Sequence, residues 1–238
     1  MERIDDLGRK NYKIIQNSEY FSFGIDAVLL AWFAKVHKNN VCVDLCSGNG
    51  IIPMLLEARN DVPATYKSVE IQQELVNMAK RSIKLNGLES KIEAICGDLR
   101  EITQIFEPSY ADIITVNPPY MPVGSLQNIN DAKTIARHEV HCTLKDIASA
   151  SKYLLKSKGK VYMIHRPQRL AEICNIFSHY NLEVKKIQLV QPKADLPPSN
   201  VLIEARQGAK PHLVMPKPII VYNADGSYTK EIEDIYYG

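Results

Sequence analysis

The stretch VCVDLCSGNGIIPMLLEAR, residues 41–59, decides the fold of this chain. Its first five residues form a short, largely apolar run, which is typical of a buried strand. Residues 51–59 indicate a helix, because Pro53 falls in the first turn, where its missing N–H leaves no helical hydrogen bond unmade. Gly48 and Gly50 lie between the two, so the stretch predicts a strand, a glycine turn and a helix.

The same alternation continues along the chain. Further strands are expected at residues 66–71, 91–96, 112–116 and 159–166, and helices at residues 72–87, 98–106, 144–155 and 168–180. Residues 182–190 and 200–208 indicate a closing antiparallel pair near the sheet edge. Repeated strand–helix units predict an α/β fold: a doubly wound, mostly parallel, seven-stranded Rossmann-like sheet with an antiparallel edge strand.

A single domain is expected over residues 1–238, since no repeat, low-complexity tract or long linker interrupts the chain. Within it, we predict an N-terminal extension at residues 1–40, a catalytic core at residues 41–210 and a C-terminal tail at residues 211–238.

The composition is that of an ordinary soluble protein. The net charge of +2, from 29 basic and 27 acidic residues, does not by itself indicate a nucleic-acid partner. No apolar run approaches the roughly 20 residues of a membrane span, and the first residues do not resemble a signal peptide, so a cytoplasmic protein is expected. Five cysteines without a Cys-x-x-Cys pair predict reduced thiols and no metal site.

Acidic residues and glycines follow the predicted strands, at the edge where ligands of doubly wound sheets bind. Gly48 and Gly50 would let the main chain approach a ligand closely. Asp44, just before them, disfavours a pyrophosphate by charge repulsion and favours an uncharged or cationic nucleoside. Glu70 can accept hydrogen bonds from two ribose hydroxyls, and Asp98 is placed to meet an adenine amino group. Each carboxylate alone could be a solvated loop residue, but three at consecutive strand ends favour a nucleoside pocket.

The stretch DIITVNPPYMP, residues 112–122, raises a separate question, because an apolar strand ends in an amide, two prolines and an aromatic ring. Pro118 and Pro119 remove two main-chain donors and force a rigid extended turn. Such a turn fixes the amide of Asn117 and the ring of Tyr120 in space. The alternative is a proline-stiffened loop with a buried tyrosine.

These motifs resemble those of class I S-adenosylmethionine-dependent methyltransferases: VDLCSGNG at residues 43–50, VEI at 69–71, GD at 97–98 and NPPY at 117–120. Three more segments are similar to the bacterial family that methylates the exocyclic amine of adenine 37 in a valine tRNA: FSFGIDAVLLAWFA at 21–34, ARHE at 136–139 and HRPQRL at 165–170. The resemblance runs from about residue 5 to residue 225.

The resemblance implies S-adenosyl-L-methionine as cofactor and RNA, most specifically a tRNA anticodon loop, as substrate. In catalysis, the Asn117 side-chain oxygen and the Pro118 carbonyl would accept hydrogen bonds from a flat exocyclic amine and aim its lone pair at the methyl group. Tyr120 would stack on the base, a contact worth roughly 1–3 kcal/mol. No general base is required, because the nitrogen's proton becomes acidic once it is alkylated.

The implied cofactor site combines residues at the strand ends with one residue of a helix expected near the N-terminus. Its members are Asp26, Asp44, Gly48, Gly50, Glu70, Ile71, Asp98, Leu99 and Asn117. Asp26 has two interpretations that can coexist, as the N-cap of that helix and as a neighbour of the methionyl ammonium. The extension at residues 1–40 would cover the cofactor pocket or touch RNA.

Four residues are candidates for binding the substrate. Arg137 and His138 lie in a long irregular insertion, residues 121–143, of the length that often forms a lid, and they could contact a phosphate or flanking bases. A surface pair that caps the next helix is an equally good interpretation of these two. His165 and Arg166 end a predicted strand and face the ligand edge, where Arg166 could hold the RNA backbone.

Other functions remain open at this point. The same acceptors could grip a protein glutamine amide or a guanine exocyclic amine in ribosomal RNA, and a noncatalytic cofactor- or RNA-binding module is the second alternative. A glutamine methyltransferase would be expected to carry a separate N-terminal helical domain, whereas about 40 residues precede the first core strand. No membrane or metal partner is expected, and the oligomeric state is open.

Overall fold

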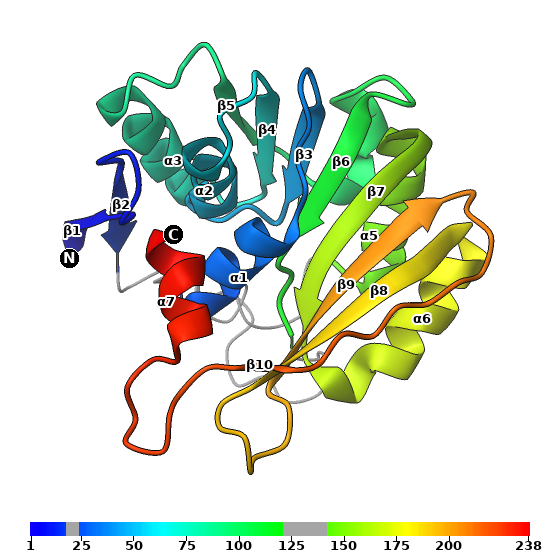
Figure 1. Cartoon of the computed structure of the whole chain (residues 1–238). Coiled ribbons are helices and arrows are strands. Elements are labelled where there is room, and N and C mark those ends of the chain that lie inside the picture. Colours follow the sequence, from blue (N-terminus) through cyan, green and yellow to red (C-terminus); the bar gives the residue numbers. More distant parts are fainter. Residues whose placement is uncertain (18–23, 121–141) are drawn as a thin grey trace, which may run out of the picture.

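The fold is taken from a computed structural model that describes residues 1–17, 24–120 and 142–238. Its main sheet has eight strands in the order β10-β8-β9-β7-β6-β3-β4-β5 (Figure 1). The strands are β3 (Val41–Leu45), β4 (Thr65–Glu70), β5 (Ile92–Cys96), β6 (Ala111–Val116), β7 (Leu155–His165), β8 (Leu182–Gln191), β9 (Asn200–Gln207) and β10 (Ile219–Ile220). The predicted doubly wound, mostly parallel sheet is therefore confirmed.

Two details of the predicted sheet were wrong. The sheet has an eighth strand, because the two-residue β10 pairs in parallel with the end of β8. The antiparallel strand is not at the edge, since β9 lies between β7 and β8 and pairs antiparallel with both. Val201, Leu202 and Ile203 of β9 are fully buried. Main-chain N–H and C=O groups that are shielded from water need hydrogen-bond partners, and a strand on each side of β9 supplies them.

Helices cover both faces of the sheet. They are α1 (Ile25–Phe33), α2 (Ile51–Arg59), α3 (Gln73–Leu85), α5 (Leu144–Leu154), α6 (Leu170–His179) and α7 (Lys230–Tyr237), with the 3₁₀ helices η1 (Leu99–Gln104) and η3 (Pro167–Arg169). The helices α1, α2, α3 and α7 share one apolar core, and η1, α5 and α6 share the other. No helix in the described ranges is long and apolar enough to cross a membrane.

The strand side chains explain this division, since successive residues of a strand point to opposite faces. In β3, Cys42 belongs to the core under α1 and α2, whereas Val43 and Leu45 belong to the core under α5. Residues 211–238, predicted as a tail, contribute to the first core, because Ile232 and Ile235 of α7 are buried there.

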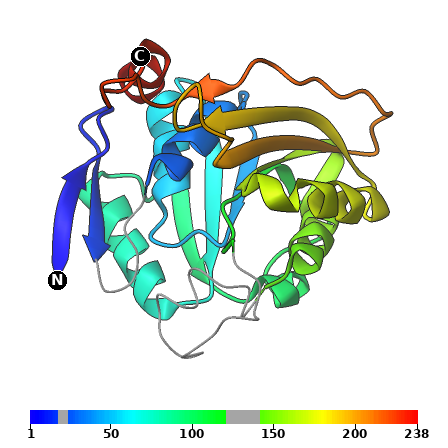
Figure 2. The same cartoon turned by 90° about the horizontal axis from the view of Figure 1, so that it is seen from below.

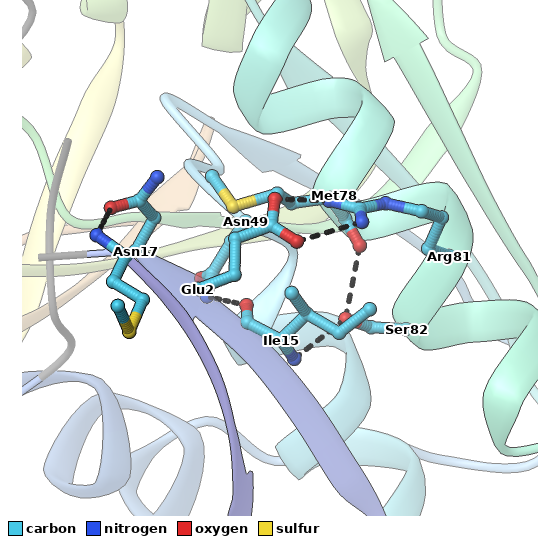
Figure 3. Close-up of polar contacts among 8 residues, drawn as sticks. Glu2, Ile15, Asn17, Asn49, Met78, Arg81 and Ser82 are labelled. Atoms are coloured by element: carbon cyan, nitrogen blue, oxygen red, sulfur yellow. Dashed lines mark hydrogen bonds and ion pairs between the residues drawn. The ribbon is translucent and has the colours of Figure 1, made fainter. Parts of the chain in front are cut away.

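A separate two-stranded hairpin, β1 (Glu2–Asp6) and β2 (Lys13–Asn17), lies beside α3 (Figure 2). The N–H of Ile15 donates to the Ser82 hydroxyl of α3 at 3.0 Å, and Arg81 forms a bidentate ion pair with Glu2. The Asn49 side chain donates to the Ile15 carbonyl at 3.0 Å (Figure 3). The N-terminal extension is thus attached to the glycine turn after β3. That it covers the cofactor pocket stays a prediction.

Candidate active site

The ends of four parallel strands lie at one edge of the sheet, as predicted. Leu45 at the end of β3 pairs with Val69 of β4 and with Val116 of β6, and Glu70 pairs with Cys96 of β5. The residues that follow these strands therefore start from neighbouring positions along this edge. The strand register brings the glycine turn, Glu70 and the Asn-Pro-Pro-Tyr turn to the same end of the sheet.

The turn after β3, residues 46–50, has the left-handed main chain that glycine favours. Gly48 has φ +57° and Gly50 has φ +78°. A Cβ atom on Gly50 would lie 3.1 Å from the Cβ of Ala79 in α3, whereas one on Gly48 would meet no described atom within 4 Å. Gly50 is thus required for packing of the turn against α3, and Gly48 leaves an open approach to the main chain.

Asp44 and Glu70 form hydrogen bonds that organise this turn. The Asp44 carboxylate is buried and accepts hydrogen bonds at 2.6 Å from the hydroxyls of Ser47 and Thr115. Burial raises the pKa of Asp44 to about 7. Glu70 accepts from the N–H of Gly48 at 2.9 Å and from the N–H of Gln72 at 3.0 Å, and burial raises the pKa of its carboxyl as well.

The sequence did not single out Ser47 and Thr115. Thr115 pairs directly with Asp44 across β3 and β6, and no signal in the sequence indicates this register. Both carboxylates are therefore engaged in organising the turn, and their direct contact with a cofactor stays a prediction.

The third acidic residue, Asp98, lies after β5 and begins η1. Its carboxylate accepts from the N–H and the side chain of Arg100, with 2.9 Å between Nε and Oδ2. The predicted neighbours differ in exposure, since Leu99 is buried and Ile71 is 36% exposed. Ile71 therefore offers an apolar surface beside the turn. The sequence did not identify Arg100 as the partner of Asp98.

The Asn-Pro-Pro-Tyr turn after β6 brings three polar groups together. The Tyr120 hydroxyl lies 2.5 Å from Oδ1 of Asn117 and 2.9 Å from Oδ2 of Asp26. The prediction that Asp26 caps α1 was wrong: Gly24 is the N-cap residue, and Asp26 is the second residue of the helix. The carboxylate of Asp26 is directed to Tyr120, so α1 and the turn after β6 meet at this hydroxyl.

His165 and Arg166, at the end of β7, support the ring of Tyr120. The guanidinium carbon of Arg166 lies 4.6 Å from the centre of that ring, and the His165 ring packs edge-on at 5.2 Å. Arg166 also donates to the Ser199 carbonyl at 3.0 Å. His165 is fully buried, and burial lowers its pKa to about 4, so it is neutral at pH 7. Both side chains therefore pack against Tyr120, and their contact with RNA stays a prediction.

Two of the predicted site residues, Arg137 and His138, lie outside the described residues. Within residues 1–17, 24–120 and 142–238, no group of three His, Cys, Asp or Glu side chains could hold a metal ion.

Comparisons with known proteins show which family and which relatives this chain resembles. The sequence profile of the family described as methyltransferase small domain matches residues 12–186. A tRNA1(Val) (adenine(37)-N6)-methyltransferase of Histophilus somni is 23% identical over 99% of this chain and 97% of its own length. The enzyme of the same name from Aeromonas hydrophila is 25% identical over 96% of this chain and 94% of its own length.

Solved structures share the fold. A predicted O-methyltransferase from Agrobacterium tumefaciens superposes with a TM-score of 0.73 and 22% identity, covering 89% of this chain and 95% of its own. Pyrococcus horikoshii TYW2, solved in complex with MeSAdo, has a TM-score of 0.61 and 14% identity, covering 87% of this chain and 72% of its own. Because the matched profile spans well over half of the 238 residues, the chain belongs to the methyltransferase small domain family.

Proposed function

We propose that this protein transfers a methyl group from S-adenosyl-L-methionine to the exocyclic amine of an adenine in RNA, most specifically in a tRNA anticodon loop. The observation that carries the proposal is the position of Asn117 and Tyr120 at the end of β6, directly beside β3 and its glycine turn. Relatives named as tRNA adenine-N6 methyltransferases align over nearly the whole chain, which supports the same substrate class.

The residues after β3 and β4 fit the nucleoside part of this cofactor. The main chain at Gly48 is open to a ligand, and a Glu70 oxygen that accepts one N–H keeps a second lone pair for a ribose hydroxyl. Ile71, being partly exposed, offers an apolar contact for the adenine ring. When bound, the cofactor supplies an electrophilic methyl group on a sulfonium.

The residues after β6 fit the acceptor. The lone pair of an exocyclic amine is delocalised into the ring, so the nitrogen is a poor nucleophile. Hydrogen bonds from its N–H groups to Asn117 Oδ1 and to the Pro118 carbonyl would favour a tetrahedral nitrogen whose lone pair is free to react. The two prolines keep these acceptors in place. A base splayed from a single-stranded loop can reach them, whereas a base inside a duplex cannot.

The proposal is tested by incubating the protein with methyl-labelled cofactor and separate tRNA, ribosomal RNA, DNA and protein fractions, followed by digestion of the labelled pool. We expect label in tRNA as N6-methyladenosine. Asn117→Ala should abolish transfer while cofactor affinity, measured by calorimetry, stays nearly the same. Asn77→Ala, on the exposed face of α3, is the matched control. Label only in protein or ribosomal RNA, or an active Asn117→Ala enzyme, would contradict the proposal.

A further inference from the structure

The Tyr120 hydroxyl has one proton and two oxygen neighbours. Asn117 Oδ1 lies 2.5 Å away and Asp26 Oδ2 lies 2.9 Å away. Burial and the nearby Asp26 raise the pKa of Tyr120 well above its ordinary value, so the phenol keeps its proton at neutral pH. A carboxylate and an amide oxygen are both acceptors, and one proton serves only one of them at a time.

This choice matters because Asn117 Oδ1 is the acceptor that the proposed substrate amine requires. While the phenol donates to Asn117, one of the two lone pairs of that oxygen is in use, and the oxygen is a weaker acceptor for the amine. When the phenol donates to Asp26 instead, its own oxygen can accept from Asn117 Nδ2. The amide is then turned so that Oδ1 points away from Tyr120 and is available.

The ring of Tyr120 cannot resolve the competition by moving away. Arg166 covers the ring at 4.6 Å and is itself held by the Ser199 carbonyl at 3.0 Å and by Asn200 Oδ1 at 3.3 Å. His165 packs against the ring edge and is fully buried. The ring position is therefore fixed, and what can change is the direction of the O–H bond together with the orientation of the Asn117 amide.

We infer that Asp26 is a positioning residue for methyl transfer, because it takes the Tyr120 hydroxyl and thereby leaves Asn117 Oδ1 free for the substrate amine. This inference rests on the proposed function and adds to it a role for α1. It differs from the predicted role of Asp26 at the methionyl ammonium, which would act on cofactor binding.

A double-mutant cycle separates the two roles. The four proteins are the wild type, Asp26→Ala, Tyr120→Phe and the double variant, and each is measured for kcat on tRNA and for cofactor Kd. Without Asp26 the phenol donates to Asn117 Oδ1, and this neutral hydrogen bond contributes about 1 kcal/mol. Asp26→Ala should therefore lower kcat about fivefold to tenfold when Tyr120 is present. With Phe at position 120 the same change should lower kcat less than about twofold, because no hydroxyl competes for Asn117. Cofactor Kd should be the same in all four.

Equal losses from Asp26→Ala in both backgrounds, accompanied by weaker cofactor binding, would assign Asp26 to the cofactor and overturn the inference. No loss in either background would overturn it too. The proposed function fails separately, through a wild type that labels no RNA. In that case the side-chain ¹⁵N–H signal of Asn117, identified by its absence in Asn117→Ala, still tests the contact: Asp26→Ala should shift it with Tyr120 present and not with Phe.

Discussion

The carboxylate of Glu70 accepts the main-chain N–H of Gly48 at 2.9 Å, so the end of β4 supports the turn that follows β3. The second oxygen accepts from Gln72, which links the same side chain to the start of α3. The buried Glu70 thus connects the turn after β3 with the segment after β4. An acidic residue at this strand end can therefore be needed before any ligand binds.

Removing Glu70 should therefore loosen the turn. Glu70→Ala leaves the N–H groups of Gly48 and Gln72 without their acceptor, and we expect cofactor affinity to fall at least about tenfold, as measured by calorimetry. Glu70→Gln keeps one acceptor oxygen and should lose less. Glu93→Ala is the matched control, because that carboxylate is exposed and pairs with Lys67 on the surface. Unchanged affinity in Glu70→Ala would show that the turn holds its shape without this residue.

The buried Asp44 should make stability depend on pH. Burial raises its pKa from 3.8 to about 7, so the folded protein binds its proton more tightly than the unfolded chain. Its contribution to the free energy of unfolding is fully present below pH 4 and is lost as pH rises through about 7. Asp44→Asn has no such loss, because an amide does not titrate. The free energy of unfolding of Asp44→Asn minus that of the wild type should therefore increase on the order of 2 kcal/mol between pH 5 and pH 9.

Urea unfolding of both proteins at the two pH values checks this prediction. His165 has the opposite dependence, since its pKa is lowered to about 4 and its contribution is lost as pH falls from 6.5. Because both proteins carry His165, its effect cancels in the difference. A difference between Asp44→Asn and the wild type that does not change with pH would contradict the assigned burial of the carboxylate.

The glycine turn offers a third prediction. Gly50→Ala should destabilise the protein by about 2–3 kcal/mol, because the left-handed main chain disfavours a side chain and the new Cβ would lie 3.1 Å from that of Ala79. Gly226→Ala has a similar φ of +88° with no described atom within 4 Å, so it should cost only the conformational part, about 1 kcal/mol. Thermal unfolding measures both, and equal losses would show that contact with α3 is unimportant.

The sequence predicted the strand ends well, because parallel strands place their carboxyl ends at one edge regardless of side-chain detail. Asp44, Glu70 and Asn117 could therefore be placed near one another before the structure was known. The sequence did not predict which groups form hydrogen bonds with these side chains. The hydroxyl of Thr115 reaches Asp44 only through the pairing of β3 with β6, and this register is a tertiary property.

Two other features were out of reach for the same reason. Asp26 and Tyr120 are 94 positions apart, so their contact depends on how α1 packs across the sheet. Residues 182–190 and 200–208 indicated an antiparallel pair, but a pair looks the same in the sequence whichever of its strands lies inside. The pairing of β9 with both β7 and β8 shows the order, and the burial of Val201 to Ile203 agrees with an interior strand.

The interior position of β9 has a consequence for biosynthesis. As the chain leaves the ribosome, β7 and β8 emerge before the strand that must lie between them. Until residues 200–207 are released, the hydrogen-bonding edge of β7 is bare, and such edges recruit other chains. A nascent protein stalled before residues 200–207 emerge would thus be a candidate for chaperone capture, whereas one in which Gln207 has left the ribosome could already complete its central sheet.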